Sequence, residues 1–200
     1  MPQFDVEDSI GSMAETVLAL GEGTFSLVGH SMGGYVALEV MRRAPGRVER
    51  LALLSTQPRA DSAEQADRRR AIVHEAERGR FSAVVAAFPA LAFHGSRLGD
   101  SALVEAFDEM ARRVGPDAFL RQQRAIMGRV DSTPGLPAIA HPTLVLCGRQ
   151  DQVTPLGNSE LMAASIPDAT LTVVEDCGHM APMERPTAIT AALFEWLGAR

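Results

Sequence analysis

A serine, an aspartate and a histidine each follow a short apolar segment of this sequence, and together these residue types can perform nucleophilic catalysis. Ser31 lies in a Gly-x-Ser-x-Gly pattern directly after the apolar run 24–28. A serine between two such glycines, where a strand turns sharply into a helix, presents its hydroxyl above the edge of a sheet. Asp151 and His179 come in that order after two later apolar runs. Ser31 is therefore a candidate nucleophile with Asp151 and His179 as partners.

Each of these residues would have a separate role in such a reaction. A neutral His179 can accept the Ser31 proton during attack and return it to the leaving group, because imidazole titrates near physiological pH. Asp151 would fix the tautomer of the His179 ring and stabilise the imidazolium. The backbone N–H of Met32, at the start of the following helix, would donate a hydrogen bond to the oxyanion. The chain order serine, acid, histidine suits a nucleophile turn joined by loops at later strand ends.

Strands and helices alternate in the segments that must position these residues. Apolar runs predict strands at 24–28, 48–55, 143–148 and 170–174. Helical periodicity predicts helices from Asp8 or Ser9 to about Leu20, at 35–41, at 156–166 and from Pro186 onward. This alternation predicts an α/β fold with a mostly parallel, doubly wound sheet. In such a sheet functional side chains collect at the carboxyl ends of the strands, where all three candidates fall.

A helical insertion interrupts the alternation between about 57 and 137. This segment is rich in Ala, Arg and Glu with helical spacing, and it contains no apolar run that predicts a strand. Residues 1–56 and 138–200 would then form the core, with 57–137 as a cap or lid. The predicted cap helices are broken by glycines and run over 62–77, 81–92, 101–114 and 116–127.

Composition narrows the class of protein. The chain has 200 residues, 46% of them hydrophobic, and a formal charge of −6, which argues against a nucleic-acid or acidic-membrane partner. No segment reaches the ~20 apolar residues that cross a bilayer, and no signal peptide is evident. Cys147 and Cys177 show no metal or disulfide spacing, so we expect free thiols in the cytoplasm. The histidines show no metal-ligand spacing, and we expect no metal or other cofactor.

The motifs around the three candidates resemble those of the α/β-hydrolase family, in particular its small bacterial, cap-bearing, esterase-like members. The resemblance runs from the first helix onward and rests on GHSMGG at 29–34, GRQD at 148–151 and CGHMAPMERP at 177–186. It implies a Ser31, Asp151, His179 triad and cofactor-free hydrolysis of a small-molecule ester or thioester through an acyl-enzyme. The same triad could instead serve carbon–carbon bond hydrolysis or perhydrolysis.

One departure from the family pattern concerns the residues before Ser31. Members usually carry an earlier strand and a glycine-containing loop that supplies a second oxyanion N–H, and neither is found here. The strand at 24–28 would then be a bare sheet edge, which is a site for pairing. We expect either a shortened gene model or a reduced protein that covers this edge as a homodimer. The alternative function is a non-catalytic relic that acts as a binding protein.

Several nearby residues have simpler interpretations. We expect His30 to pack against or orient its neighbours, since strand alternation turns it away from Ser31. Asp176 is a rival acid, but it lies too close in sequence to His179 to orient the ring from behind. Glu184 is expected to pair with Arg185 or a helix terminus. An apolar acyl pocket is a further hypothesis, which core packing would explain equally well, for Met32, Phe88, Phe93, Leu120 and Met127.

Overall fold

The computed structural model describes residues 4–198, and the strands within them form one four-stranded sheet of order β1-β2-β3-β4. The strands are β1 (Phe25–His30), β2 (Val48–Leu54), β3 (Thr143–Gly148) and β4 (Ala169–Val174). Every neighbouring pair is parallel. The predicted α/β architecture with a parallel sheet is therefore confirmed.

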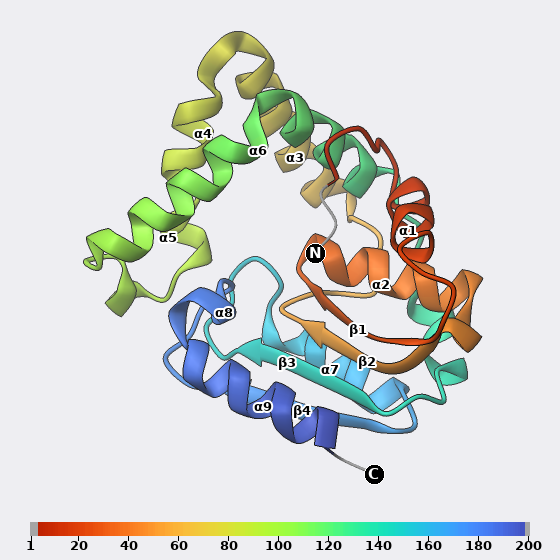
Figure 1. The fold of residues 1–200 in the computed structure, drawn as a ribbon. Coiled ribbons are helices and arrows are strands. Elements are labelled where there is room, and N and C mark those ends of the chain that lie inside the picture. Colours follow the sequence, from red (N-terminus) through yellow and green to blue (C-terminus); the bar gives the residue numbers. More distant parts are fainter. Residues whose placement is uncertain (1–3, 199–200) are drawn as a thin grey trace.

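Helices cover both faces of this sheet (Figure 1). On one face lie α1 (Ile10–Leu18), α2 (Met32–Arg43) and α7 (Leu156–Ser165), and on the other lies α9 (Pro186–Gly198). Alternation along β2 divides the core, because successive side chains of a strand point to opposite faces. One cluster includes Met13, Val40, Leu51, Leu53 and Met162, and the other includes Ala52, Leu54, Leu146, Ile189 and Trp196.

Local signals in the sequence explain where the first two helices begin and end. The Ser9 side chain accepts a hydrogen bond from the Ser12 backbone N–H, which caps α1. α2 starts at the residue after Ser31 and ends at Arg43, before Pro45. Because only Ser31 separates β1 from α2, the turn at Ser31 is fixed by the edge strand before it and by the largely buried helix after it.

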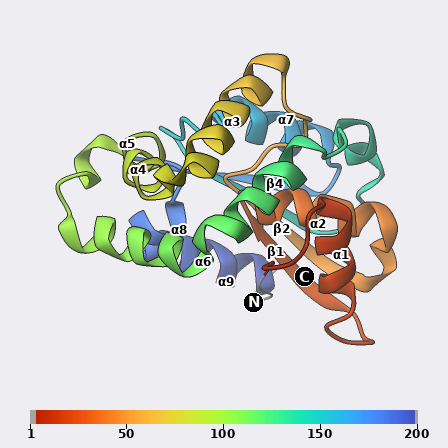
Figure 2. The ribbon, with the colours of Figure 1, turned by 90° about the horizontal axis from the view of Figure 1, so that it is seen from above.

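The helices between β2 and β3 lie beyond the carboxyl ends of the strands (Figures 1 and 2). We call α3 (Ala63–Glu75), α4 (Phe81–Ala87), α5 (Pro89–Ala92) and α6 (Ser101–Met127) the inserted helices. A π-helical segment, Ala76–Arg80, joins α3 to α4, and a 3₁₀ turn, Gly95–Arg97, precedes α6. Gly79 and Gly115 have φ values of 78° and 75°, so the chain bends at two of the predicted glycines. The bend at Gly115 lies inside α6, between the two helices predicted there.

A separate apolar cluster joins the inserted helices to the segment after His179. It contains Val85, Phe93, Leu103, Phe107 and Met180. Phe93 meets Phe107 edge to face, with ring centroids 5.7 Å apart, and Phe88 stacks on the same ring. Phe93 is only 1% exposed, so it packs inside this cluster and does not line an open pocket.

The remaining turns complete the core, and β1 and β4 are the two edge strands of the sheet. A 3₁₀ segment, Thr133–Ala138, leads into β3, and the short helix α8 (Ala181–Glu184) precedes α9. Among the described strands β1 pairs with β2 alone, and Val28 on β1 is 46% exposed.

None of the helices within residues 4–198 has the length and apolar character that crossing a membrane requires.

Candidate active site

Ser31 lies in a strained turn between β1 and α2. Its backbone has φ 52° and ψ −118°, a conformation that L residues rarely adopt. Its N–H donates to the Leu54 carbonyl at 3.0 Å, which fixes the turn to the end of β2. A Cβ at Gly29 would lie 2.4 Å from the Gly33 carbonyl oxygen, so only glycine allows this close approach of strand and helix.

The structure brings Ser31, Asp151 and His179 together in one chain of hydrogen bonds. The His179 Nε2 lies 2.8 Å from the Ser31 Oγ, and the His179 Nδ1 lies 2.9 Å from an Asp151 carboxylate oxygen. A carboxylate can only accept, so the Nδ1 carries a proton and donates to Asp151. In the neutral ring the Nε2 then accepts from the Ser31 hydroxyl. His179 and Asp151 are almost fully buried, so the hydrogen bond between them is shielded from solvent.

Asp151 is held as a carboxylate by the loop after β3. Burial alone would raise the pKa of Asp151, but hydrogen bonds from His179 and Thr154 outweigh that effect and lower it below its ordinary value. The backbone N–H groups of Val153 and Thr154 each donate to one carboxylate oxygen at 2.8 Å. The Thr154 hydroxyl donates to the other oxygen, also at 2.8 Å. Asp151 is therefore charged and fixed before any substrate binds.

Thr154 was not among the residues singled out from the sequence. It is 1% exposed, and its Oγ1 also lies 3.4 Å from the His179 Nδ1. The signal was local, because an aspartate commonly accepts bonds from backbone N–H groups two or three residues later. The Asp-x-x-Thr spacing after the third strand could have identified it.

The backbone N–H of Met32 belongs to the first turn of α2. N–H groups in a first turn have no acceptor within their own helix, and the helix dipole makes this end attractive to negative charge. Met32 directly follows Ser31, so this donor stands next to the hydroxyl that His179 contacts. The role of Met32 as an oxyanion donor stays a prediction, based on this place at the start of α2.

His30 contacts the backbone of His179. Its Nε2 lies 2.9 Å from the His179 carbonyl oxygen, to which it donates, and the two rings are 5.2 Å apart. Burial, followed by the nearby His179, lowers the pKa of His30 to about 4, so its ring is neutral near neutral pH. His30 therefore supports the loop that carries His179.

The rival acid and the cysteine of the same loop do not join the hydrogen-bond chain. Asp176 has an exposed side chain, and its carbonyl oxygen accepts from the Arg185 guanidinium. The carboxylate that accepts from His179 is Asp151. Cys177 is a buried free thiol, and burial raises its pKa to about 12. Within residues 4–198 no cluster of three or more His, Cys, Asp or Glu side chains could hold a metal ion.

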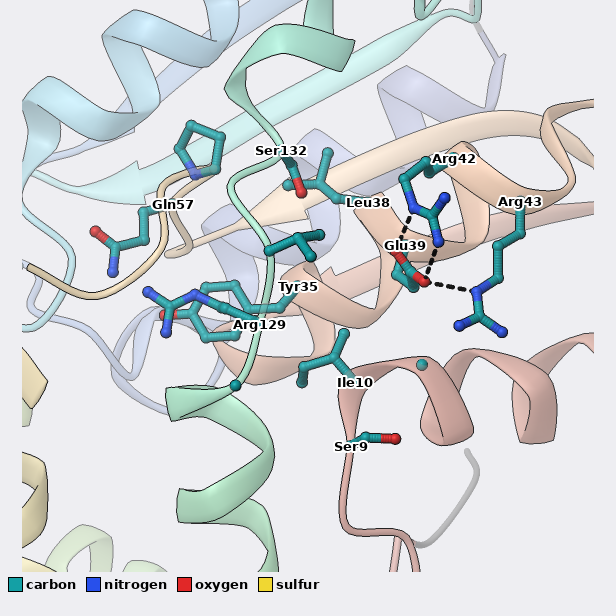
Figure 3. Close-up of a pocket in the computed structure, with 14 residues that line it drawn as sticks. Ser9, Ile10, Tyr35, Leu38, Glu39, Arg42, Arg43, Gln57, Arg129 and Ser132 are labelled. Carbon is teal, nitrogen blue, oxygen red and sulfur yellow. Dashed lines mark hydrogen bonds and ion pairs between the residues drawn. The ribbon is translucent and has the colours of Figure 1, made fainter.

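A cavity of about 310 Å³ lies between α1, α2 and residues 128–132, away from the hydrogen-bond chain (Figure 3). Its walls include Tyr35, but Ser31, Asp151 and His179 do not line it. The cations at its rim are held in ion pairs: Arg42 and Arg43 with Glu39, Arg43 also with Glu15, and Arg129 with Asp61. We therefore assign the reactive site to the Ser31 region and not to this cavity.

Known proteins resemble this chain in sequence and in fold. A family model described as alpha/beta hydrolase fold matches residues 1–186. A pimeloyl-[acyl-carrier protein] methyl ester esterase of Nitrosomonas europaea is 30% identical over 86% of this chain and 71% of its own. Among solved structures, a thermophilic esterase from Thermogutta terrifontis has a TM-score of 0.87 and 32% identity, over 94% of this chain and 72% of that one. A hydrolase from Pseudomonas aeruginosa has a TM-score of 0.85 and 32% identity, over 96% and 72%.

Proposed function

Because the chain belongs to the α/β-hydrolase fold family, we propose that it is a serine hydrolase that cleaves a small or medium ester or thioester. The observation that carries this proposal is the unbroken chain of hydrogen bonds from Asp151 through His179 to Ser31. The similarity to two esterases supports acyl chemistry in particular. The proposed substrate is a small or medium uncharged acyl compound, and the proposed mechanism uses no cofactor.

The first half of the reaction forms an acyl-enzyme. The Ser31 Oγ attacks the carbonyl carbon while its proton moves to the His179 Nε2. Asp151 stabilises the imidazolium that forms, and the Met32 N–H donates to the oxyanion of the tetrahedral intermediate. Collapse of the intermediate breaks the bond to the alcohol or thiol, which leaves with the proton from His179.

The second half releases the acid. Water enters, gives one proton to the His179 Nε2 and attacks the acyl carbon. A second tetrahedral intermediate forms at the same oxyanion position, and it collapses to the carboxylic acid as the His179 Nε2 returns the proton to the Ser31 Oγ. The net reaction adds one water across the acyl bond, and every group on the enzyme returns to its starting state.

The inserted helices set access to Ser31 in this proposal. They lie beyond the strand ends that carry the hydrogen-bond chain, and they are anchored to the segment around His179 (Figure 1). Their aromatic cluster of Phe88, Phe93 and Phe107 gives the cap a packed interior. We therefore propose that a substrate has to pass the inserted helices to reach Ser31.

Labelling by a fluorophosphonate probe tests the proposal. We expect one phosphonyl group per chain, located on Ser31 by peptide mass spectrometry, together with hydrolysis of short p-nitrophenyl esters. Ser31→Ala and His179→Ala should abolish both. Ser26→Ala is the matched control, because Ser26 is an exposed serine on β1, before the Ser31 turn, and its replacement should leave both unchanged. A folded chain that takes no label on Ser31 would favour the binding-protein alternative.

The same triad also suits carbon–carbon hydrolysis and perhydrolysis. We propose ester or thioester hydrolysis because both esterases above share this fold at 30% identity or more. Product analysis with matched ester, diketone and peroxide substrates separates the three reactions. Turnover of a diketone alone, with Ser31 still labelled, would change the assigned reaction while leaving the assigned residues in place.

A further inference from the structure

The carboxylate of Glu184 joins two segments that lie far apart in the sequence. Glu184 ends α8 and is 2% exposed. Its Oε1 and Oε2 accept from the Gly178 backbone N–H at 3.0 and 3.1 Å, and its Oε2 also accepts from the His94 backbone N–H at 2.8 Å. Gly178 directly precedes His179, and His94 follows the end of α5. One buried side chain thus connects the loop of the proposed base with the cap.

The same two segments are in close backbone contact. The N–H of His179 donates to the Ala92 carbonyl at 2.7 Å, and the N–H of Met180 lies 3.3 Å from the same oxygen. A Cβ at Gly178 would lie 2.6 Å from the Ala92 oxygen, so glycine alone allows this approach. These contacts do not involve the Glu184 side chain, so its three hydrogen bonds add to a junction that the backbone already makes.

The partners of Glu184 are backbone N–H groups. The neighbouring Arg185 donates to the Asp176 carbonyl oxygen, so the expected pairing with Arg185 is replaced by bonds to Gly178 and His94. Hydrogen bonds between a charged acceptor and N–H donors are shorter and stronger than neutral ones. Removing a buried partner also leaves donors unsatisfied, which is costly. A carboxylate in this place therefore fixes the two segments more firmly than packing alone would.

We propose that Glu184 is a positioning residue, which sets the distance between the His179 ring and the Ser31 hydroxyl by fixing the His179 loop to the inserted helices. This inference rests on the function proposed above. It implies that a shift of the inserted helices would also shift the His179 ring relative to Ser31. A shift of the His179 ring by about 1 Å can cost on the order of 100-fold in rate. We therefore expect the hydrogen bonds of Glu184 to affect kcat.

Glu184→Ala tests the inference by removing the carboxylate that accepts from Gly178 and His94. We expect kcat for p-nitrophenyl esters to fall by about tenfold or more, with KM changed much less, in a chain that remains folded by circular dichroism. The low-field proton resonance of the His179 Nδ1–H should shift, because its bond to Asp151 is realigned. Glu175→Ala is the matched control, since Glu175 is an exposed glutamate near the same loop and pairs only with Arg149 in the described bonds.

His94→Pro tests the cap side and keeps the inference falsifiable when Glu184→Ala does not fold. His94 has φ −60° and ψ 142°, and Phe93 before it is extended, so proline fits the backbone while removing the N–H that Glu184 accepts. We expect the same loss of kcat and the same shift of the His179 resonance. His94→Ala is the control, because it removes the imidazole but keeps the N–H, and it should resemble the unmodified chain.

The results separate this inference from the proposed function. An unmodified chain that never labels on Ser31 overturns the function, and the His179 resonance then decides the positioning role without any activity assay. If that resonance and kcat are unchanged in the folded variants, Glu184 has only a structural role and the inference is wrong. A lower melting temperature with unchanged kcat leads to the same conclusion.

Discussion

The His30 Nε2 lies 2.9 Å from the carbonyl oxygen of His179, so the side chain next to the proposed nucleophile supports the backbone of the proposed base. This bond joins the end of β1 to a loop 149 residues later. The strained Ser31 turn and the His179 loop are therefore held to each other by two bonds, one through each histidine ring.

His30 predicts a pH dependence of stability. Its pKa is lowered from 6.5 to about 4, so between these values the unfolded chain binds a proton that the folded chain does not. We expect the free energy of unfolding to fall as the pH is lowered from about 6.5 towards 4. Urea titrations at several pH values measure it. His30→Gln, which keeps an N–H donor but cannot titrate, should show a smaller slope, and an equal slope would contradict the prediction.

We expect removal of the Thr154 hydroxyl to lower both the stability and the activity of the protein. Thr154→Val leaves one Asp151 oxygen without its 2.8 Å donor, and we expect a cost of about 1–3 kcal/mol at neutral pH. The lowered pKa of Asp151 means that its contribution is present above its ordinary value of 3.8 and is lost as the pH falls through the lower folded value. The variant should therefore lose less stability than the unmodified chain on acidification. Thr154→Ser, which keeps the hydroxyl, is the control in urea titrations and ester assays.

We expect a methyl group at Gly178 to disturb the contact between the inserted helices and the His179 loop. Gly178→Ala would place a Cβ 2.6 Å from the Ala92 oxygen and 2.7 Å from the His94 nitrogen. We expect a destabilisation of about 1–3 kcal/mol and faster deuterium exchange at residues 92–94. Gly157→Ala is the control, because Gly157 lies in α7 with open space around its Cβ and should gain slightly in stability. Equal behaviour of the two variants would refute the steric argument.

The open edge of β1 predicts self-association. Unpaired N–H and C=O groups on an edge strand favour pairing with another chain, and the exposed Val28 adds apolar surface. We expect a homodimer by light scattering, at a mass twice the 21.4 kDa of one chain. Val28→Lys should reduce the dimer, whereas Val130→Lys, at an exposed valine outside the sheet, should not. A monomer at all concentrations would exclude this interface.

Much of the fold and of the candidate site followed from local patterns. The predicted strand at 143–148 matches β3, and the last helix begins at Pro186 as predicted. Apolar runs and caps report on the backbone within a few residues, so they locate strands, helices and the loops between them. Parallel strands then bring their carboxyl ends to one edge, which is why Ser31, Asp151 and His179 could be selected as neighbours before any distance was known.

Tertiary structure alone decided which partners these residues have. Glu184 and His94 are 90 residues apart, and nothing in either local pattern indicates that one would accept a bond from the other. Local patterns likewise do not indicate that His30 contacts the His179 carbonyl, or that Phe93 packs in the apolar cluster with Met180. Sequence periodicity shows which residues are buried in an element. The closest neighbour of a buried side chain is set by how distant segments pack, and that packing exists only in the folded chain.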